Sequence, residues 1–301
     1  MSCASRSNSA TMADSSPAPL RWALWLLLFC CCASVGAASP GPELHLRKPA
    51  PPGNEGLCAD WAYRVPLVTP ARCMRANLEA AAQRTVQGRR IYHRDMRNPD
   101  AAIRVLVVGG MHGDELSSTA LALQWIEQAQ STGSNVQWRF IPMLNPDGVF
   151  AKPSRRTNAH GVDLNRNFPT PDWKREAAFY WEQRTRRDPR RWPGPHPLSE
   201  PESRYLDAQM REFKPHLIVS IHAPYGLLDY DGPSTPPPKL GRLYLDQVGI
   251  FPGSLGNYGG VQQGMPVVTI ELPNALQAPG EAETRQMWID LLRWIAEHIK
   301  A

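Results

Sequence analysis

Four continuous apolar segments constrain the fold of this chain more than any other feature of its sequence. They are IRVLVVGG at 103–110, VQWRFIPML at 136–144, HLIVSIH at 216–222 and PVVTIEL at 266–272. Apolar runs of this length, rich in β-branched residues, predict strands that are buried on both faces. Segments with helical patterning lie at 116–130, 199–213 and 281–299. This alternation predicts an α/β fold: a single domain with a central mixed, mostly parallel sheet flanked by helices.

Two local patterns refine the element boundaries. TVQGRRIYHRDM at 85–96 predicts two short extended pieces around Gly88. Ser199, with Glu202 three residues later, has the spacing of a capping box. Ser199 is therefore predicted to cap the helix that follows it.

The N-terminal segment has the pattern of a secretory signal peptide. Arg21 precedes WALWLLLFCCCASVGAA, a short apolar run that ends in small residues. We therefore expect a signal peptide at 1–38 and a secreted or periplasmic protein after its cleavage. The apolar core is shorter than the ~20 residues of a membrane span, so we expect no span in the mature form. Lipid attachment at Cys30–Cys32 is the alternative, although Leu28 and Phe29 stand where such a signal has a small residue.

The residues after the predicted signal peptide divide into three parts. Residues 39–57 are rich in proline and glycine, which predicts a linker. An N-terminal segment follows at 58–84, and the main domain is expected at 85–301. Cys58 and Cys73, the only cysteines beyond the signal peptide, predict one disulfide in an exported protein. Such a bridge would stabilise the fold by roughly 3 kcal/mol in the chain-entropy model; two buried free thiols are the alternative.

The charge pattern excludes one class of partner. A formal net charge of +5 on 301 residues is too small to indicate a nucleic-acid-binding protein. A basic, proline-rich stretch, RTRRDPRRWPGPHP at 184–197, stands apart from the rest. We interpret it as a solvated surface loop; contact with an anionic polymer such as cell wall is the alternative.

Three of the four predicted strands end in residues that are unusual for a buried strand. His112 and Glu115 follow the first strand, His222 ends the third, and Glu271 ends the fourth. Ligands bind at the carboxyl ends of the strands in open α/β sheets. These four side chains are therefore expected to meet at one edge of the sheet.

The four residues match the needs of a hydrolytic zinc site. Such sites use three protein ligands and leave one position for water, and two histidines with one glutamate form one such set. His112, Glu115 and His222 are the predicted ligands of one zinc ion. Glu271 is then the predicted base that takes a proton from water and passes it to the leaving amine. Each of the four residues alone has a simpler structural explanation, but their coincidence at strand ends favours a metal site. Asp114 is not included in this site and is assigned to the loop or to the start of the helix that follows.

The stretch RRTNAHGVDLNRNFP at 155–169 concentrates polar and charged residues between the first ligand pair and His222. It contains Arg156, Asp163, Asn165 and Arg166. Arginine recognises carboxylates in bidentate fashion and can hold a developing oxyanion. A polar surface turn is the alternative for this stretch.

Read in order, these features resemble the zinc carboxypeptidase family. The resemblance rests on His-x-x-Glu, an arginine followed nine residues later by Asn-Arg in DLNRNFP, a strand-end histidine and a strand-end glutamate. It covers roughly residues 85–300. GMHGDE, GVDLNRNFP, IHAPYG with LDYDGP, and FPGSLGNY with VTIELP are similar to the bacterial branch typified by murein peptide amidase A.

The resemblance implies a role for each metal-site residue. His112, Glu115 and His222 would bind zinc. Glu271 would be the general base and acid. Arg156 would polarise the scissile carbonyl and stabilise the tetrahedral oxyanion.

It also implies roles in substrate binding. Asn165 and Arg166 would grip the terminal carboxylate of the substrate, and Asp163 would orient His112. Val248 stands where the family has a mobile tyrosine; Tyr258 is the candidate to replace it, with a packing role as the alternative. Leu255 would stand where the family sets side-chain preference, without the acid expected for a basic-residue carboxypeptidase.

These implications predict a zinc metallocarboxypeptidase that acts on a small peptide with a free C-terminal carboxylate. The resemblance and the exported location point to murein-derived peptides cut at the γ-D-glutamyl–diaminopimelate bond. Two other functions remain open at this stage: a zinc deacylase of N-acyl amino acids, and a non-catalytic cell-wall binding module.

Overall fold

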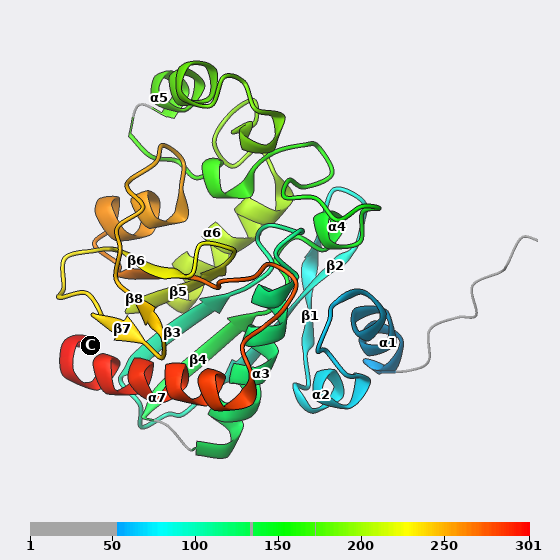
Figure 1. The fold of residues 1–301 in the computed structure, drawn as a ribbon, viewed down its shortest axis with the longest axis vertical. Coiled ribbons are helices and arrows are strands. Elements are labelled where there is room, and N and C mark those ends of the chain that lie inside the picture. The colour runs from blue at the N-terminus through cyan, green and yellow to red at the C-terminus, as the bar shows by residue number, and fades with distance from the viewer. Residues whose placement is uncertain (1–52, 133–134, 172) are drawn as a thin grey trace, which may run out of the picture. The chain divides into compact units, whose positions relative to one another are not determined.

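The computed structural model describes residues 53–132, 135–171 and 173–301 and contains one large mixed sheet. The predicted signal peptide and most of the predicted linker lie outside these residues. The seven strands lie side by side in the order β1 (Glu79–Arg84), β2 (Arg90–Met96), β4 (Val136–Ile141), β3 (Ile103–Val108), β5 (Leu217–His222), β9 (Val267–Glu271) and β6 (Leu227–Asp231) (Figure 1). A separate small sheet pairs β7 (Lys239–Leu240) with β8 (Leu243–Tyr244). The predicted α/β class is confirmed.

The four central strands are the four apolar segments of the sequence, and they run parallel to one another. The outer strands β1, β2 and β6 pair in antiparallel fashion. Successive residues of β3 enter two different hydrophobic clusters: Val105 and Val107 join one, and Leu106 and Val108 join the other. Burial on both faces explains why these segments are apolar throughout rather than alternating.

Helices cover both faces of the sheet. The cluster on one face includes side chains of α3 (Leu116–Thr132) and α7 (Glu281–His298), which lie on the near side in Figure 1. The cluster on the other face includes side chains of α6 (Pro201–Phe213). Among the described residues, no helix combines the length and the apolar character needed to cross a membrane.

Several short elements lie in the connections. They are α4 (Pro146–Val149), η1 (Leu164–Arg166), α5 (Trp173–Phe179), η2 (Tyr180–Arg184), η3 (Pro189–Arg191) and η4 (Gly256–Gln262).

Two predicted boundaries are wrong. The first extended piece lies before 85–87, because β1 occupies Glu79–Arg84 and the chain turns at 85–89, where Gly88 has a φ of 76°. The alanines of β1 have low strand propensity, so the sequence pattern did not indicate a strand at this position. Ser199 does not cap α6: the N-cap is Glu200, followed by Pro201. Proline is favoured at a first helical position, and the Ser199 hydroxyl instead donates to Glu200 Oε1.

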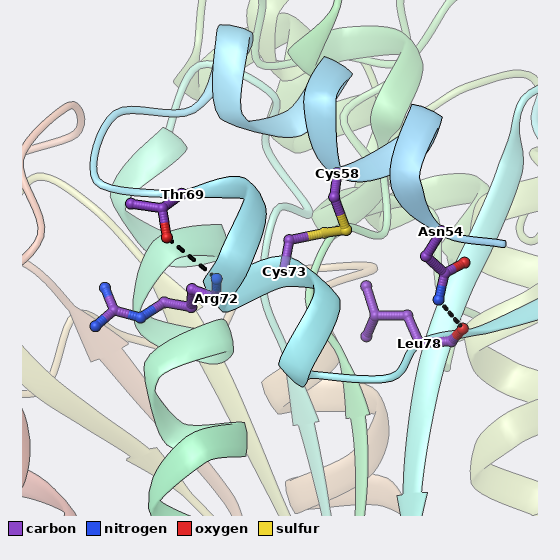
Figure 2. The surroundings of a disulfide bond; sticks show 6 residues. All are labelled: Asn54, Cys58, Thr69, Arg72, Cys73 and Leu78. Atoms are coloured by element: carbon purple, nitrogen blue, oxygen red, sulfur yellow. Dashed lines mark hydrogen bonds between the residues drawn. A yellow bond between two sulfur atoms is a disulfide. The ribbon is translucent and has the colours of Figure 1, made fainter. Parts of the chain in front are cut away.

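The predicted disulfide is confirmed. It joins Cys58 in α1 (Glu55–Arg64) to Cys73 in α2 (Pro70–Arg75), with a Cα–Cα distance of 5.4 Å (Figure 2). Thr69 caps α2 by accepting a hydrogen bond from the backbone N–H of Arg72. Helix α1 begins at Glu55, within the segment that we predicted as a linker.

The N-terminal segment packs as part of the main domain. Strand β1 joins the sheet through β2, and Trp61 belongs to the same hydrophobic cluster as the side chains of α3. Arg72 and Arg75 both donate to Glu127 of α3. The side chain of Arg64 donates to the backbone carbonyl of Val149 at 2.6 Å. Residues 58–84 therefore belong to the single domain rather than standing apart from it.

Candidate metal centre and active site

The loop after β3 is fixed tightly to its neighbours. The Gly109 N–H donates to the carbonyl of Ile141 at the end of β4, and the Gly110 N–H donates to Ser118 Oγ on α3. Gly110 has a φ of 58°, and a Cβ there would lie 2.8 Å from Thr119 Oγ1. Only glycine meets both demands without strain. The chain thus turns sharply off the strand and presents His112 and Glu115 at the strand ends.

A buried amide, Asn145, ties this loop to the segment that carries Arg156. Its Nδ2 lies 3.3 Å from the carbonyl oxygens of Met111 and Arg156, and its Oδ1 accepts from the Gly148 N–H. The sequence Asn145-Pro146-Asp147-Gly148 indicates a turn and nothing more. Asn145 holds in one place the backbone of two functional segments that are far apart in sequence.

The three predicted metal ligands converge. His112 Nδ1 lies 2.8 Å from Glu115 Oε1, and His222 Nδ1 lies 3.0 Å from Glu115 Oε2. The two Nδ1 atoms are 3.0 Å apart. All three residues are buried, and one ligand atom from each lies within 4.8 Å of the others.

The surroundings of the two histidines make this set suitable for a cation. Asp163 Oδ1 lies 3.1 Å from His112 Nε2, and Ser220 Oγ lies 2.9 Å from His222 Nε2. A carboxylate only accepts, so it places the proton of a neutral His112 on Nε2 and leaves a lone pair on Nδ1. The hydroxyl of Ser220 can accept from His222 in the same way. Two lone pairs and a carboxylate that face one another fit a zinc ion, which takes histidine nitrogen and carboxylate oxygen.

Neighbouring side chains keep the carboxylates of this cluster ionised. Burial opposes ionisation of Glu115, but His112 and His222 outweigh it and hold the pKa of Glu115 well below its usual range. Burial is likewise outweighed at Asp163, where the Arg156 guanidinium holds the pKa well below its ordinary value. Both groups therefore carry negative charge at neutral pH.

Arg156 lies between these two carboxylates. Its Nε donates to Asp163 Oδ2 at 3.0 Å, and its Nη1 lies 3.3 Å from Glu115 Oε1. The side chain is buried and lines the cavity beside the ligand set. It places a fixed positive charge next to the predicted metal position.

Glu271 ends β9 directly opposite His222 in the register of the sheet. Its carboxyl group lines the cavity, and Oε2 is buried without a hydrogen-bond partner. Burial and the nearby charge of Glu115 raise the pKa of Glu271. Glu271 therefore lies next to the ligand set and has an oxygen free to take a proton.

The cavity has a volume of about 310 Å³ and extends from the ligand set to Asn165 and Arg166. The Arg166 guanidinium lies 4.5 Å from the centre of the Phe251 ring, and its Nε has no partner. Asn165 Oδ1 accepts from the Leu255 N–H at 2.8 Å. A Cβ on Gly253 would lie 2.0 Å from the Arg166 carbonyl oxygen, so glycine is required for this close approach. The same cavity thus contains the hydrolytic residues and an arginine suited to a carboxylate.

Two predicted substrate residues do not reach the cavity. The Tyr258 hydroxyl donates to Asp207 Oδ1 at 2.7 Å, and the ring stacks on Phe168. Burial and the contact with Asp207 raise the pKa of Tyr258 to about 12. The Leu255 side chain is 1% exposed and lies in the hydrophobic cluster. Tyr258 therefore takes the packing role, and Leu255 contributes its backbone N–H.

The stretch 184–197 is not simply a solvated loop, contrary to our interpretation. Thr185, Asp188 and Arg191 line the cavity. Arg190 Nη1 forms an ion pair with Asp114 Oδ2 at 2.9 Å. The loop forms one wall of the cavity, and Asp114 holds it in place instead of joining the metal ligands.

Other cavity residues were missed by sequence reasoning. They are Tyr180, Tyr225, Asp229, Asp231 and Phe251. Val248, which stands where the family has a mobile tyrosine, also lines the cavity. Tyr225 lies in IHAPYG, three residues after His222, so proximity to a ligand was an available signal. The two aspartates alternate along LDYDGP, which places them on one face of a strand.

Comparison with known proteins identifies the family. The sequence pattern described as zinc carboxypeptidase matches residues 79–242, which is more than half of the chain. The chain belongs to the zinc carboxypeptidase family. Its members are zinc enzymes that hydrolyse peptide bonds. As a member of this family, the chain is expected to carry its hydrolytic centre at the strand ends described above.

Two relatives of this zinc carboxypeptidase are murein peptide amidases. Murein peptide amidase A of Escherichia coli K12 is 31% identical over 199 residues, which cover 63% of this chain and 79% of the relative. The protein of the same name from Vibrio campbellii is 33% identical over 180 residues, which cover 56% of this chain and 69% of the relative.

Solved structures share the fold. The crystal structure of murein-tripeptide amidase from Escherichia coli O157 has a TM-score of 0.50 at 24% identity and covers 72% of this chain and 92% of its own. Carboxypeptidase A from Helicoverpa armigera has a TM-score of 0.54 at 18% identity and covers 71% of this chain and 66% of its own. At these identities the likeness shows the fold alone.

Proposed function

We propose that this protein is a zinc metallocarboxypeptidase that releases the C-terminal residue of murein-derived peptides, at the γ-D-glutamyl–diaminopimelate bond. The observation that carries the proposal is one cavity lined by His112 and Glu115 of the ligand set, by Glu271 and by a buried arginine suited to a carboxylate. The similarity to murein peptide amidases supports the choice of substrate.

The proposed ligands of one zinc ion per chain are His112, Glu115 and His222. When bound, zinc supplies Lewis acidity, which polarises a carbonyl group and makes water a better nucleophile. Asp163 and Ser220 hold the two imidazoles in the orientation that directs Nδ1 at the shared point.

The side chains around the ligand set would carry the proton and the charge. Glu271 takes a proton from the attacking water and delivers it to the leaving amine as the C–N bond breaks. A raised pKa suits a group that must accept and then donate a proton. Arg156 faces the negative charge that develops on the scissile carbonyl oxygen.

Asn165 and Arg166 would bind the free carboxylate of the terminal residue. A guanidinium and a carboxylate form two parallel hydrogen bonds, which fix the orientation of the substrate. An N-acyl amino acid carries the same carboxylate, so a deacylase remains the competing function. A binding module has no use for an unpartnered buried base such as Glu271.

Secretion or export to the periplasm is part of the proposal. It rests on the signal peptide predicted at 1–38, outside the described residues. The disulfide between Cys58 and Cys73 supports it, because disulfides persist in oxidising compartments.

The test is a substrate panel. The purified protein is incubated with L-Ala-γ-D-Glu-meso-diaminopimelate, ordinary α-linked peptides and N-acyl amino acids, with and without a zinc chelator. Chelator-sensitive release of diaminopimelate, faster than release from the other substrates, is the expected result. Faster hydrolysis of N-acyl amino acids would identify a deacylase, and no chelator-sensitive hydrolysis at all would contradict an enzymatic function.

A further inference from the structure

Two aspartates form part of the cavity wall on the edge strand β6. Asp229 and Asp231 are two residues apart, so both point to the same face of the strand. They are 8% and 9% exposed, and both line the cavity. Asp229 lies opposite Thr269 in the register, and Thr269 and Glu271 line the same cavity. One wall therefore runs from the proposed base to the two aspartates.

These carboxylates have no cationic partner in the described part of the chain. Asp229 Oδ1 accepts from the backbone N–H groups of Tyr230 at 2.9 Å and Val248 at 3.3 Å. Asp231 accepts no hydrogen bond from any described residue, and neither aspartate forms an ion pair among those residues. Burial and the proximity of Asp229 raise the pKa of Asp231 to about 6. Uncompensated buried carboxylates cost free energy unless something pairs with them.

The chain packs so closely on Asp231 that its carboxylate has a fixed place. A Cβ on Gly256 would lie 1.9 Å from Asp231 Oδ2, and a Cβ on Gly260 would lie 2.4 Å from the Asp231 carbonyl oxygen. Both glycines belong to η4, which packs against the end of β6. Any side chain at these two positions would displace Asp231 from the cavity wall.

The cavity also contains the opposite charge without a complete set of partners. Arg166 lines it, is buried, and has no partner for its Nε. Arg191 lines it as well. A ligand that satisfies both kinds of group carries a carboxylate and a cationic group on the same residue.

We infer that Asp229 and Asp231 recognise a cationic amine or guanidinium on the side chain of the C-terminal residue that the enzyme releases. The inference rests on the proposed function, which sets the direction of the substrate through Asn165 and Arg166. Diaminopimelate, lysine, ornithine and arginine carry such a group, and norleucine does not. Leu255 lacks the acid expected for a basic-residue carboxypeptidase, and Asp229 and Asp231 of β6 would take that role instead.

The test compares three substrates that share the acyl half L-Ala-γ-D-Glu and end in meso-diaminopimelate, L-lysine or L-norleucine. Lysine and norleucine differ in the amine alone. The zinc-loaded wild-type protein is expected to favour lysine over norleucine by about 100-fold in kcat/KM, because the unpaired carboxylates reject a neutral chain. Asp229→Asn and Asp231→Asn are expected to reduce this ratio to below about tenfold, mainly through slower cleavage of the lysine and diaminopimelate substrates.

The matched control is Asp246→Asn. Asp246 is exposed, lies close enough to Asp229 to raise its pKa, and does not line the cavity. This variant is expected to keep the wild-type ratio. Thermal unfolding of each variant checks folding. Binding of free lysine and free norleucine, followed by calorimetry, tests the same preference without turnover, with lysine expected to bind more tightly.

The outcomes separate the two proposals. Equal cleavage of the lysine and norleucine substrates, or equal losses on both in the aspartate variants, contradicts the inference alone. The absence of any chelator-sensitive hydrolysis contradicts the proposed function, and calorimetry then still decides the inference: equal binding of lysine and norleucine overturns it.

Discussion

The two halves of the cavity treat buried charge in opposite ways. In the metal half, His112, Glu115, Asp163 and Arg156 form hydrogen bonds and ion pairs with one another, and Glu271 is the residue that keeps one buried oxygen without a partner. In the substrate half, Asp231 accepts no hydrogen bond from the described residues. Arg166 donates from Nη1 to the Asn165 carbonyl but leaves its Nε without a partner. A buried charged group that is paired within the protein needs no ligand to compensate its charge. A buried charged group without such a partner can be compensated by an opposite charge on the ligand. The metal half should therefore govern whether hydrolysis occurs, and the substrate half should govern on which peptide.

The largest effect is expected from the loss of a metal ligand. His222→Ala removes one of three ligands, so the variant should retain no stoichiometric zinc and lose at least about 10⁴-fold in kcat/KM on every substrate. Metal analysis and kinetics check both. His196→Ala, which removes an exposed histidine of the loop at 184–197, is the control and should change neither. Zinc retained with full activity would exclude His222 as a ligand.

A smaller loss is expected from Glu271→Gln. The amide keeps the size of the side chain but cannot take a proton, so kcat should fall by about 10³-fold while zinc content is unchanged. Glu281→Gln on the exposed start of α7 is the matched control. Full activity in Glu271→Gln would exclude Glu271 as the base. It would also contradict the claim that the metal half governs whether hydrolysis occurs.

Arg166→Ala should act on substrate binding. Losing one partner of a buried charge pair costs about 2–5 kcal/mol, so kcat/KM should fall by about 30- to 5000-fold, with zinc content unchanged. The same peptides with an amidated C-terminus should already be poor substrates and should lose little more. Arg187→Ala, at an exposed arginine outside the cavity, is the control. An equal loss on free and amidated peptides would show that Arg166 does not bind the carboxylate.

The smallest effect is expected in stability. The pKa of Asp231 is about 6 in the folded protein against an ordinary value of 3.8, so the folded state holds a proton that the unfolded state has lost in this window. The free energy of unfolding should therefore fall as pH rises from about 4 to about 6, and the penalty should persist above pH 6. Asp231→Asn lacks this penalty and should be more stable than wild type by about 1–2 kcal/mol at pH 8, with little gain at pH 4.

Denaturant unfolding at the two pH values measures this difference. Asp246→Asn, at an exposed position, should show a much smaller pH-dependent gain. A loss of stability in Asp231→Asn at pH 8 would mean that Asp231 already has a partner in the protein, contrary to the contrast between the two halves.

The metal half could be predicted from sequence because its residues stand at the ends of parallel strands. The carboxyl ends of such strands meet at one edge, so His112, Glu115, His222 and Glu271 could be placed together before any coordinates were known. The apolar runs that precede them are continuous, which made the strands easy to recognise.

The substrate half could not be predicted in the same way. Tyr258 is near Glu271 in sequence, but η4 turns its hydroxyl towards Asp207 of α6. Leu255 is apolar and packs where apolar side chains are buried. Asp229 and Asp231 lie on an edge strand whose partner is β9, and only that pairing brings them to the cavity. The residues that line this wall are determined by long-range strand pairing and loop packing, which a local sequence pattern does not show.

The most direct test of the account follows zinc and hydrolysis together. Metal-free protein is titrated with zinc while release of diaminopimelate from L-Ala-γ-D-Glu-meso-diaminopimelate is measured. Activity is expected to rise in proportion to zinc and to level off at one equivalent per chain, with no rise in the His222→Ala variant. Release of diaminopimelate by the metal-free protein at the full rate would contradict the account.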